Sequence, residues 1–374
     1  MSDSERVPAA RRYSLAREMP PVEIDKSLAY EFVQSLIIYS EHEWHEKKDY
    51  GYDVGEEWFE NIRIPGRQNL LKDLERFTLQ VFSTRCVLHS WSHFLGFVYD
   101  SPQPKDVPAF LRYLESLEPL EIRLCLLGYY QRDLRKITPL DVILQAAEGN
   151  EEALEQFFKT ALPESLVAQE RIRWLVFSDG EAMKGQLIAL LWSWYEQVFH
   201  AQEGQIQPIL ERDIEAKEKL QATVSPEKLI ELATNGLVYG PEIAVRKIVL
   251  VPSFLTRPWN EVPTYQDIKL IIYPVADESV RPDRSVPPAQ LVRLYQALAD
   301  ERRLRILKLL KTRDYSLQEI SDEFGVAKST MHHHLGLLRT AGLVRIRDDE
   351  RQYSLRQEML ATVSSLLETF LNDS

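Results

Sequence analysis

The sequence predicts a mainly α protein: a large helical N-terminal domain with a β-hairpin near its end, followed by a smaller C-terminal domain. Apolar residues recur at steps of three and four along most of the 374 residues, as on one face of a helix. Two β-branched runs, at 246–251 and 268–273, interrupt this period. With 44% hydrophobic and 10% aromatic residues, the chain is long enough to bury two or three cores.

Changes in composition predict the domain boundaries. Residues 1–21 mix serine, proline, arginine and alanine without periodicity, as mobile termini do. Prolines among charged residues, at 277–288, are typical of a linker. We therefore expect a flexible N-terminal arm at 1–21, a mostly helical sensor domain at 22–276 that ends in the β-hairpin, a linker at 277–288 and a C-terminal domain at 289–374.

Nine segments of the N-terminal domain have helical periodicity, and first-turn prolines or glycine-containing breaks separate them. The expected helices span 27–38, 70–98, 107–117, 119–132, 139–148, 151–161, 163–177, 181–199 and 206–220. The two β-branched runs that follow flank a long proline-rich loop. We expect them to pair as a hairpin that packs on the helical domain or on the C-terminal domain.

The C-terminal domain contains two short helices joined by a tight turn. Ser316 and Glu319 have the spacing of a capping box, which predicts that the first helix begins immediately after Ser316. Gly325 supplies the left-handed backbone that ends it. The second helix is expected at 328–340. This arrangement is typical of a helix-turn-helix that reads DNA.

The second helix has an apolar and a polar face. Met331, Leu335 and Leu338 share the inner face, while small and polar side chains occupy the first turns, where they suit base edges and phosphates of the major groove. Two short strands, at 343–347 and 352–355, complete a wing with a polar tip. The expected DNA-contacting residues are Lys328, Ser329, Thr330, His332, His333, Arg339, Arg345, Arg347 and Arg351.

From about residue 287 to residue 371, a quarter of the chain, the sequence resembles an ArsR-type winged-helix repressor domain. The resemblance rests on LYQALADERRLRILKLL, on SLQEISDEFGVAKSTMHHHLGLLRTAGLV and on a wing that ends in QYSLR. It departs from the family at Ala327, where serine is common, and at the wing tip, which carries three acids. The cysteine and histidine–aspartate sets of metal-sensing members are absent from the sequence. The resemblance therefore implies DNA binding without metal sensing.

The same resemblance implies a homodimer that the first and last helices of the domain hold together. The terminal helix has a nearly heptad apolar stripe, which favours helix pairing. The expected dimerisation residues are Leu291, Leu294, Met359, Val363, Leu366 and Phe370. Such a dimer would place two reading helices about 34 Å apart on one face of DNA.

The charge of the chain is unevenly divided. The net charge is -12, yet residues 286–374 hold 13 lysines and arginines against 12 aspartates and glutamates. The acidity therefore belongs to the upstream domain. Because the C-terminal domain is only slightly basic, its affinity for DNA must come from local cations duplicated by dimerisation, and we expect binding to be salt-sensitive.

The upstream domain offers two candidate sites. Histidine pairs with helical spacing, His42 with His45 and His89 with His93, lack the glutamate spacing of zinc hydrolases, so we predict no metal, no cofactor and no catalytic residue. Aromatic residues either form a wall for a small apolar or aromatic effector or belong to the core. They are Trp192, Trp194, Tyr195 and Phe199 on one helix and Tyr129 and Tyr130 on another.

Together these features predict a DNA-binding transcriptional regulator, a repressor, whose winged helix reads an operator in double-stranded DNA under control of the sensor domain. The run KIVLVPS, a long loop and LIIYP also resembles the end of an uncharacterised sensor-like domain that precedes ArsR-type domains in some bacterial regulators. A helical enzyme with an appended winged helix and a protein-interaction module are the alternatives. Without an apolar run of roughly 18 residues or a signal segment, we expect a cytoplasmic protein that contacts no membrane.

Overall fold

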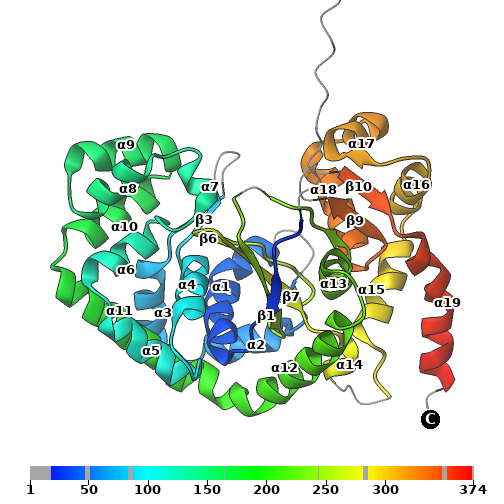
Figure 1. The fold of residues 1–374 in the computed structure, drawn as a ribbon, viewed down its shortest axis with the longest axis horizontal. Coiled ribbons are helices and arrows are strands. Elements are labelled where there is room, and N and C mark those ends of the chain that lie inside the picture. The colour runs from blue at the N-terminus through cyan, green and yellow to red at the C-terminus, as the bar shows by residue number, and fades with distance from the viewer. Residues whose placement is uncertain are drawn as a thin grey trace, which may run out of the picture.

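The structure is a computed structural model of the 374-residue chain, and it describes residues 18–46, 51–82, 87–163, 165–242, 244–280, 285–347 and 352–372. Most of these residues are helical, which confirms the predicted mainly α fold. A helical lobe, a four-stranded sheet and a winged-helix lobe follow one another across the molecule (Figure 1). Of the predicted N-terminal arm, residues 1–17 lie outside the described residues.

Helix α1 (Leu28–Glu46) lies at the centre of the helical lobe. Tyr30, Phe32 and Leu36 on it are at most 1% exposed. The other helices that precede the long strands are α2 (Gly55–Ile62), α3 (Gln68–Phe77), α4 (Ser90–Asp100), α5 (Val107–Ser116), α6 (Pro119–Leu126), α7 (Arg132–Arg135), α8 (Leu140–Ala147), α9 (Glu151–Ala161), α10 (Leu166–Phe177), α11 (Gly180–Trp194), the π-helix η1 (Tyr195–Phe199), α12 (His200–Gln221) and α13 (Pro226–Ala233).

Helix starts in this lobe follow from N-terminal caps. Asp106, Asn150, Ser165 and Asp179 each accept a hydrogen bond from the backbone amide three residues further along. Such a cap satisfies one of the amides that the first turn leaves without an intrahelical partner. The predicted helices therefore begin close to the observed ones wherever a capping residue stands in the sequence.

The longest predicted helix, 70–98, is wrong. The chain leaves helix α3 at Thr78 and forms two short antiparallel strands, β2 (Gln80–Phe82) and β3 (Val87–His89), before α4 begins. β-Branched and aromatic residues in these strands favour extended backbone over helix. Apolar spacing on both sides of the break happens to continue one helical period, which is why the sequence pattern did not show the break.

The predicted hairpin is also wrong, because its two long strands are parallel neighbours. β5 (Lys247–Ser253) pairs with β7 (Ile268–Pro274) in the register Lys247↔Ile268, and β1 (Val22–Ile24) pairs with β5, also in parallel. The two-residue strand β6 (Thr264–Tyr265) pairs antiparallel with β7, and an antiparallel bridge joins Glu261 to Ile272 of β7. The long loop after β5 returns the chain to the other end of the sheet, so that parallel pairing becomes geometrically accessible.

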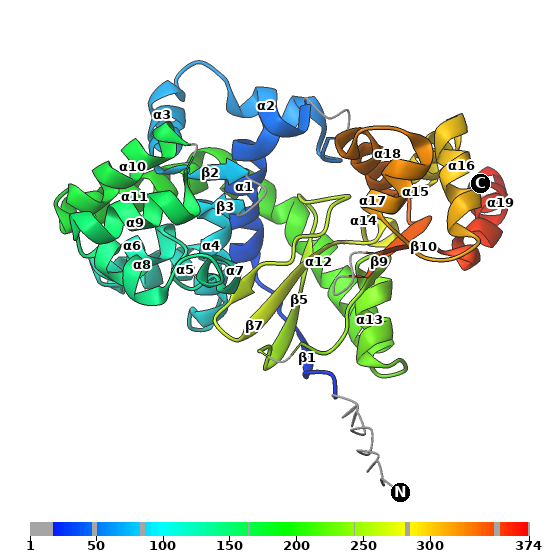
Figure 2. The ribbon, with the colours of Figure 1, turned by 90° about the horizontal axis from the view of Figure 1, so that it is seen from above.

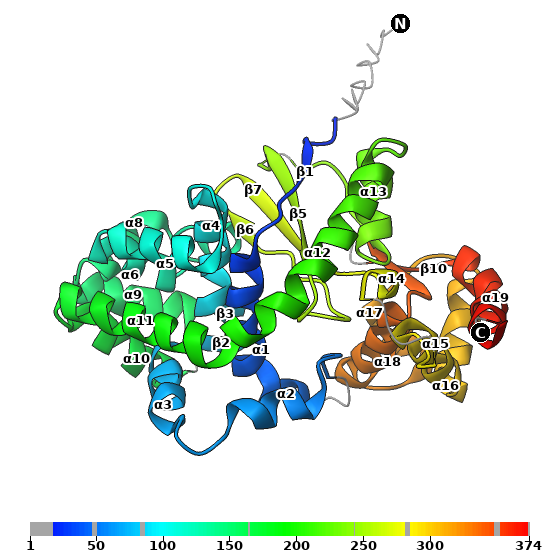
Figure 3. The ribbon, with the colours of Figure 1, turned by 90° about the horizontal axis from the view of Figure 1, so that it is seen from below.

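Both faces of this sheet are covered, as is usual for parallel sheets. Val249 and Leu270 belong to the core of the helical lobe, while their neighbours Leu250 and Ile271 pack with residues of α13. Figure 3 shows α12 running from the helical lobe along the sheet towards α13 and the short helix α14 (Asp277–Val280). The first four residues of the predicted linker thus form α14, and residues 281–284 lie outside the described part of the chain.

The winged helix has the predicted order of elements. It comprises α15 (Ala289–Leu298), α16 (Glu301–Leu310), β8 (Tyr315–Ser316), α17 (Leu317–Phe324), α18 (Lys328–Thr340), β9 (Val344–Arg347), β10 (Gln352–Leu355) and α19 (Gln357–Asn372). The capping box is present, with the Ser316 backbone amide donating to Glu319 over 2.8 Å and lowering the pKa of that carboxyl to about 2. Gly325 adopts a φ of 62° at the end of α17, as expected.

One strand of the wing sheet comes from the upstream domain. β4 (Leu237–Val238), which follows α13, pairs in parallel with β9, so that the strand order is β4-β9-β10-β8. Gly236 reaches this position with a φ of 116°, a backbone conformation that favours glycine. Figure 2 shows α13 between the long strands and the wing. The two domains are therefore joined through backbone hydrogen bonds as well as side chains.

Candidate DNA-binding interface

The first turns of α18 carry an exposed polar surface. Lys328, Ser329, Thr330 and His332 are exposed, while the inner-face residue Met331 is completely buried. Ala327, in the N-cap position, makes no side-chain hydrogen bond to the first-turn amides. These amides and the positive end of the helix dipole face outwards, where they suit a phosphate oxygen.

The three consecutive histidines have different environments. His332 is exposed, His333 is half-buried and His334 is 8% exposed. Burial lowers the pKa of His334, so its ring is neutral at neutral pH despite the nearby carboxylate of Asp300. The structure therefore directs the first histidine outwards and the third into the winged-helix core. Gly336, two residues further along α18, is also buried.

The second half of α18 faces the upstream domain rather than open solvent. The Arg339 guanidinium lies 5.8 Å from the ring centroid of Trp259, which is in the loop between β5 and β6. Figure 2 shows α18 on the side of the winged helix nearest α2. A small cavity of about 200 Å³ separates the two surfaces, and both His332 and Arg339 line it.

The upstream wall of this small cavity is acidic. Glu41 and Glu261 line it together with Tyr52, whose hydroxyl donates to Glu41 over 3.1 Å. Removal from water and the neighbouring Glu41 carboxylate raise the pKa of Glu261 well above its usual range. Sequence patterns did not link Glu261 with Glu41 and Tyr52, because it lies more than 200 positions from both and only the folded chain brings the three together.

Cations at the base of the wing are paired with protein. Arg345 lies 2.9 Å from Glu231 of α13 and also pairs with Glu358 at the start of α19. Arg347 is exposed at the end of β9, and Arg351 lies outside the described residues. Arg356, to which the sequence analysis gave no role, is buried and donates to Asn235 over 2.7 Å. The predicted DNA contacts therefore lie in two groups, one facing solvent and one facing the upstream domain.

The residues expected to form a dimer interface lie on adjacent helices. Leu291 and Leu294 of α15 are buried within the single chain, whereas the α19 stripe is less covered. Its members Met359, Val363 and Phe370 are half-buried, and Leu366 is 36% exposed. Within the described residues of α19, none is fully buried, so this helix keeps an apolar surface for a further contact.

Three of the upstream aromatic residues belong to the core of the helical lobe. Trp194 and Phe199 are completely buried, and Tyr195 is 8% exposed. Trp194 donates to the Ser35 hydroxyl over 2.8 Å, while Trp192 at the edge donates to Glu115. Tyr129, Tyr130 and Trp192 are only partly buried against this core, so burial supports the core interpretation for the other three residues alone.

Histidines of the upstream domain also take part in packing. The His42 ring stacks on Phe59 with centroids 3.5 Å apart, and the His93 Nδ1 lies 2.9 Å from the Cys125 carbonyl. Burial lowers the pKa of His93 to about 4. The described residues contain no group of three or more metal-ligating side chains, and the side chain of His45 is not among those described.

Comparison with known proteins places the winged helix in a family. The family described as bacterial regulatory protein, arsR family, matches residues 300–345. An uncharacterized HTH-type transcriptional regulator of Mycobacterium tuberculosis is 37% identical over 86 residues, which cover 21% of this chain and 75% of that protein. No solved structure matches the chain.

Two further relatives have named roles. The transcriptional activator HlyU of Vibrio cholerae is 35% identical over 81 residues, covering 21% of this chain and 75% of HlyU. The transcriptional repressor SdpR of Bacillus subtilis is 30% identical over 84 residues, covering 21% of this chain and 90% of SdpR. Among the described helices, none is both long and apolar enough to cross a membrane. This chain belongs to the arsR family of bacterial regulatory proteins and is a DNA-binding transcriptional regulator.

Proposed function

We propose that the protein is a dimeric repressor whose winged helix reads an operator under control of the upstream domain. The observation that carries this proposal is the division of α18. Its first turns present exposed polar side chains, while Arg339 in its second half lies against Trp259 of the upstream domain. A DNA-reading helix that contacts a second domain along half its length responds to movements of that domain.

In the proposed complex, the side chains of the first turns contact base edges, and cations of the helix end and wing contact phosphates. The base-edge group consists of Lys328, Ser329, Thr330, His332 and His333, and the phosphate group of Arg339, Arg345, Arg347 and Arg351. Arg339 and Arg345 are held by the upstream domain in this structure. We expect both arginines to leave these partners when the protein binds DNA tightly.

A second copy of the chain would pack on α15 and α19. The apolar stripe of α19 supports this, since Leu366 is 36% and Leu371 69% exposed in the single chain. Pairing would bury Met359, Val363, Leu366 and Phe370 more completely and duplicate the reading helix, while Leu291 and Leu294, already buried in the single chain, would support α15 from within. Two helices about 34 Å apart match successive major grooves on one face of DNA. An inverted-repeat operator is the expected target.

The relatives do not decide between activation and repression, because HlyU is named an activator and SdpR a repressor. We propose repression for this chain, since a dimer bound over a promoter excludes other proteins without needing an activating contact. Transcription from its operator in the presence and absence of the protein would decide the sign.

Binding of the full chain to its own promoter DNA and to random DNA, at two salt concentrations, tests the proposal. Replacing Ser329, His332 and His333 by alanine should bring the two affinities together, because base-edge contacts carry selectivity. A matched control changes the exposed α19 residues Gln357 and Ser365 to alanine. Selectivity that survives the triple substitution would show that another face reads the DNA.

One observation favours an alternative role as a protein-interaction module. The second half of α18 and the strand β9 already contact protein, through Trp259 and β4. If a folded dimer binds neither promoter nor random DNA at low salt, this alternative replaces the regulator.

A further inference from the structure

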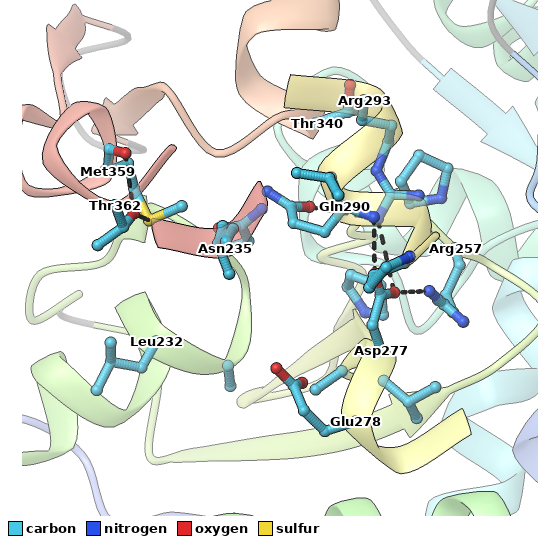
Figure 4. A pocket seen from close by; sticks show the side chains of 18 of the residues that line it. Leu232, Asn235, Arg257, Asp277, Glu278, Gln290, Arg293, Thr340, Met359 and Thr362 are labelled. Atoms are coloured by element: carbon cyan, nitrogen blue, oxygen red, sulfur yellow. Dashed lines mark hydrogen bonds and ion pairs between the residues drawn. The ribbon is translucent and has the colours of Figure 1, made fainter. Parts of the chain in front are cut away.

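A larger cavity, of about 490 Å³, lies between the upstream domain and the winged helix. Its upstream walls are α13, α14 and the loop after β5, and its other walls are α15, the end of α18 and α19. Figure 4 shows side chains from both domains that point into it. This volume lies within the range of sites for small organic ligands.

One end of the cavity is an interdomain cluster of charges. Arg293 of α15 donates to Asp53 over 2.7 Å, and Arg257 of the upstream domain pairs with Asp277 of α14. The backbone amide of Gln290 donates to the second oxygen of Asp277 over 2.7 Å. Both oxygens of the Asp277 carboxylate therefore already accept a hydrogen bond.

The donors of the cluster are not all used. The Nε atom of Arg293 is buried and has no hydrogen-bond partner among the residues that the structure describes. Lys217 also lies on the cavity wall, but its ammonium is paired with the buried Asp213 over 3.1 Å, and the wall carboxylates are Asp277 and the exposed Glu278. A buried donor without a partner is costly, and a ligand oxygen that accepts from it would remove that cost. Each cation of the cluster has a carboxylate partner, so the preference of this end rests on the Arg293 Nε donor, which suits a ligand group with acceptor oxygens, such as a carboxylate, and not a group that can only donate.

The opposite end of the cavity is apolar. Leu232 of α13 is 39% exposed and Leu366 of α19 is 36% exposed, and Met359 lies beside them on the cavity wall. Figure 4 shows Leu232 and Met359 on the side away from the Arg257–Asp277–Arg293 cluster. Contact with an apolar ligand would remove this surface from water, which favours binding.

We propose that this interdomain cavity binds an amphipathic monocarboxylate, with its carboxylate at Arg293 and its apolar body between Leu232, Met359 and Leu366. This inference deepens the proposed function, since it assigns the effector site of the regulator. The ligand touches α15 and α19, the two helices expected to form the dimer, and Thr340 at the end of the reading helix. Occupancy would therefore alter the spacing of the two reading helices.

Calorimetry on the full-length protein without DNA tests the site, with decanoate, decan-1-ol and decylamine as probes that share one apolar body. Decanoate should bind at one site, at least tenfold more tightly than decanol, and decylamine more weakly than either. Arg293→Gln should reduce decanoate affinity to that of decanol. Equal or tighter binding of decylamine, or no saturable binding by the folded wild-type protein, would overturn the proposal.

Two tryptophan substitutions on α19 locate the site without touching the charge cluster. Met359→Trp fills the cavity and should abolish decanoate binding, whereas Leu360→Trp, the adjacent exposed position outside the lining, should leave it unchanged. Equal affinities in the two variants would place binding elsewhere and reject the proposal. This pair decides the location even if Arg293→Gln does not fold.

The operator affinity of the wild-type protein is measured separately, with and without decanoate. A change of threefold or more in operator affinity supports the effector role of the site. If the protein binds decanoate at the cavity but binds no DNA, the proposed function is rejected and the proposed ligand site is kept. If it binds DNA selectively but does not bind decanoate, the proposed ligand site is rejected and the proposed function is kept.

Discussion

At the scale of single residues, the close approaches in this fold have clear consequences. Gly96 on α4 faces Tyr265 on β6 so closely that a Cβ atom at that position would lie 1.9 Å from the Tyr265 ring. Gly185 on α11 is exposed and has no neighbouring atom within 4 Å of such a Cβ among the described residues. A methyl group would therefore clash with Tyr265 at position 96 and meet open space at position 185.

We expect Gly96→Ala to lower the free energy of unfolding by about 1–3 kcal/mol, because α4 and the sheet must move apart. Gly185→Ala should instead raise it by about 0.5–1 kcal/mol, since alanine favours helix where there is room. Urea unfolding of both variants measures the difference. A neutral Gly96→Ala would show that α4 does not pack on β6 in solution.

The buried carboxylate of Glu261 predicts a dependence of stability on pH. Its pKa is raised in the folded protein by removal from water and by the Glu41 carboxylate, so the folded state holds this proton more tightly than the unfolded state. The stabilisation is complete below the ordinary glutamate pKa, and it is lost as the pH rises through the raised value.

Glu261→Gln should therefore flatten the fall in melting temperature between pH 5.5 and pH 8. The exposed Glu57→Gln on α2 is the charge-matched control, and it should keep the wild-type slope. Parallel slopes in the wild type and in Glu261→Gln would mean that another group causes the pH dependence.

At the scale of elements, the contact between α13 and the wing holds the wing against the upstream domain. Arg345 is held by Glu231, and β4 adds to β9 beside it. The two side chains are half-buried, and an ion pair near the surface contributes on the order of 1 kcal/mol. Its removal would free Arg345 from the upstream domain and leave it paired with Glu358 of its own domain, so that a phosphate competes with one carboxylate instead of two.

Glu231→Gln should consequently increase operator affinity, by up to about fivefold for an ion pair of about 1 kcal/mol. Glu227→Gln, on the same helix and exposed, removes one negative charge without this pairing and serves as the control. Fluorescence anisotropy with labelled operator DNA compares the two. Equal affinities would indicate that the pair between α13 and the wing does not restrain DNA binding.

At the scale of the whole molecule, an acidic body carries a nearly neutral reading domain. The net charge is -12, while residues 286–374 contain one more cation than anion. The upstream domain therefore repels DNA, and attraction depends on the cations of the winged helix. Each phosphate contact releases counterions, so the number of such contacts sets the salt dependence of binding.

Arg347→Ala should weaken binding to operator and random DNA about equally and reduce the slope of log K against log salt by about one. Arg347 is exposed at the end of β9 and lies outside the base-edge group of α18. Titration at four salt concentrations gives the slope. A loss confined to the operator would assign Arg347 to base readout instead.

The sequence by itself determined the winged helix, because its signals act over short distances. The Ser316–Glu319 capping box, the left-handed Gly325 and the apolar spacing of α18 each specify backbone within one or two turns. The same locality explains why helices with capping residues, such as Asp106 and Asn150, began near their predicted positions. The exposed first turns of α18 could also be predicted, since they follow from one helical period.

Only the tertiary structure decided the pairing of the long strands, the break at β2 and β3, and the surroundings of α18. Parallel and antiparallel neighbours have the same local sequence pattern, because the direction of β5 relative to β7 depends on the path of the loop between them. The contacts of Arg339 with Trp259 and of Arg345 with Glu231 join residues 80 or more positions apart. Periodicity carries no information about such distant partners, so the link between the acidic domain and the reading helix appears only when the chain is folded.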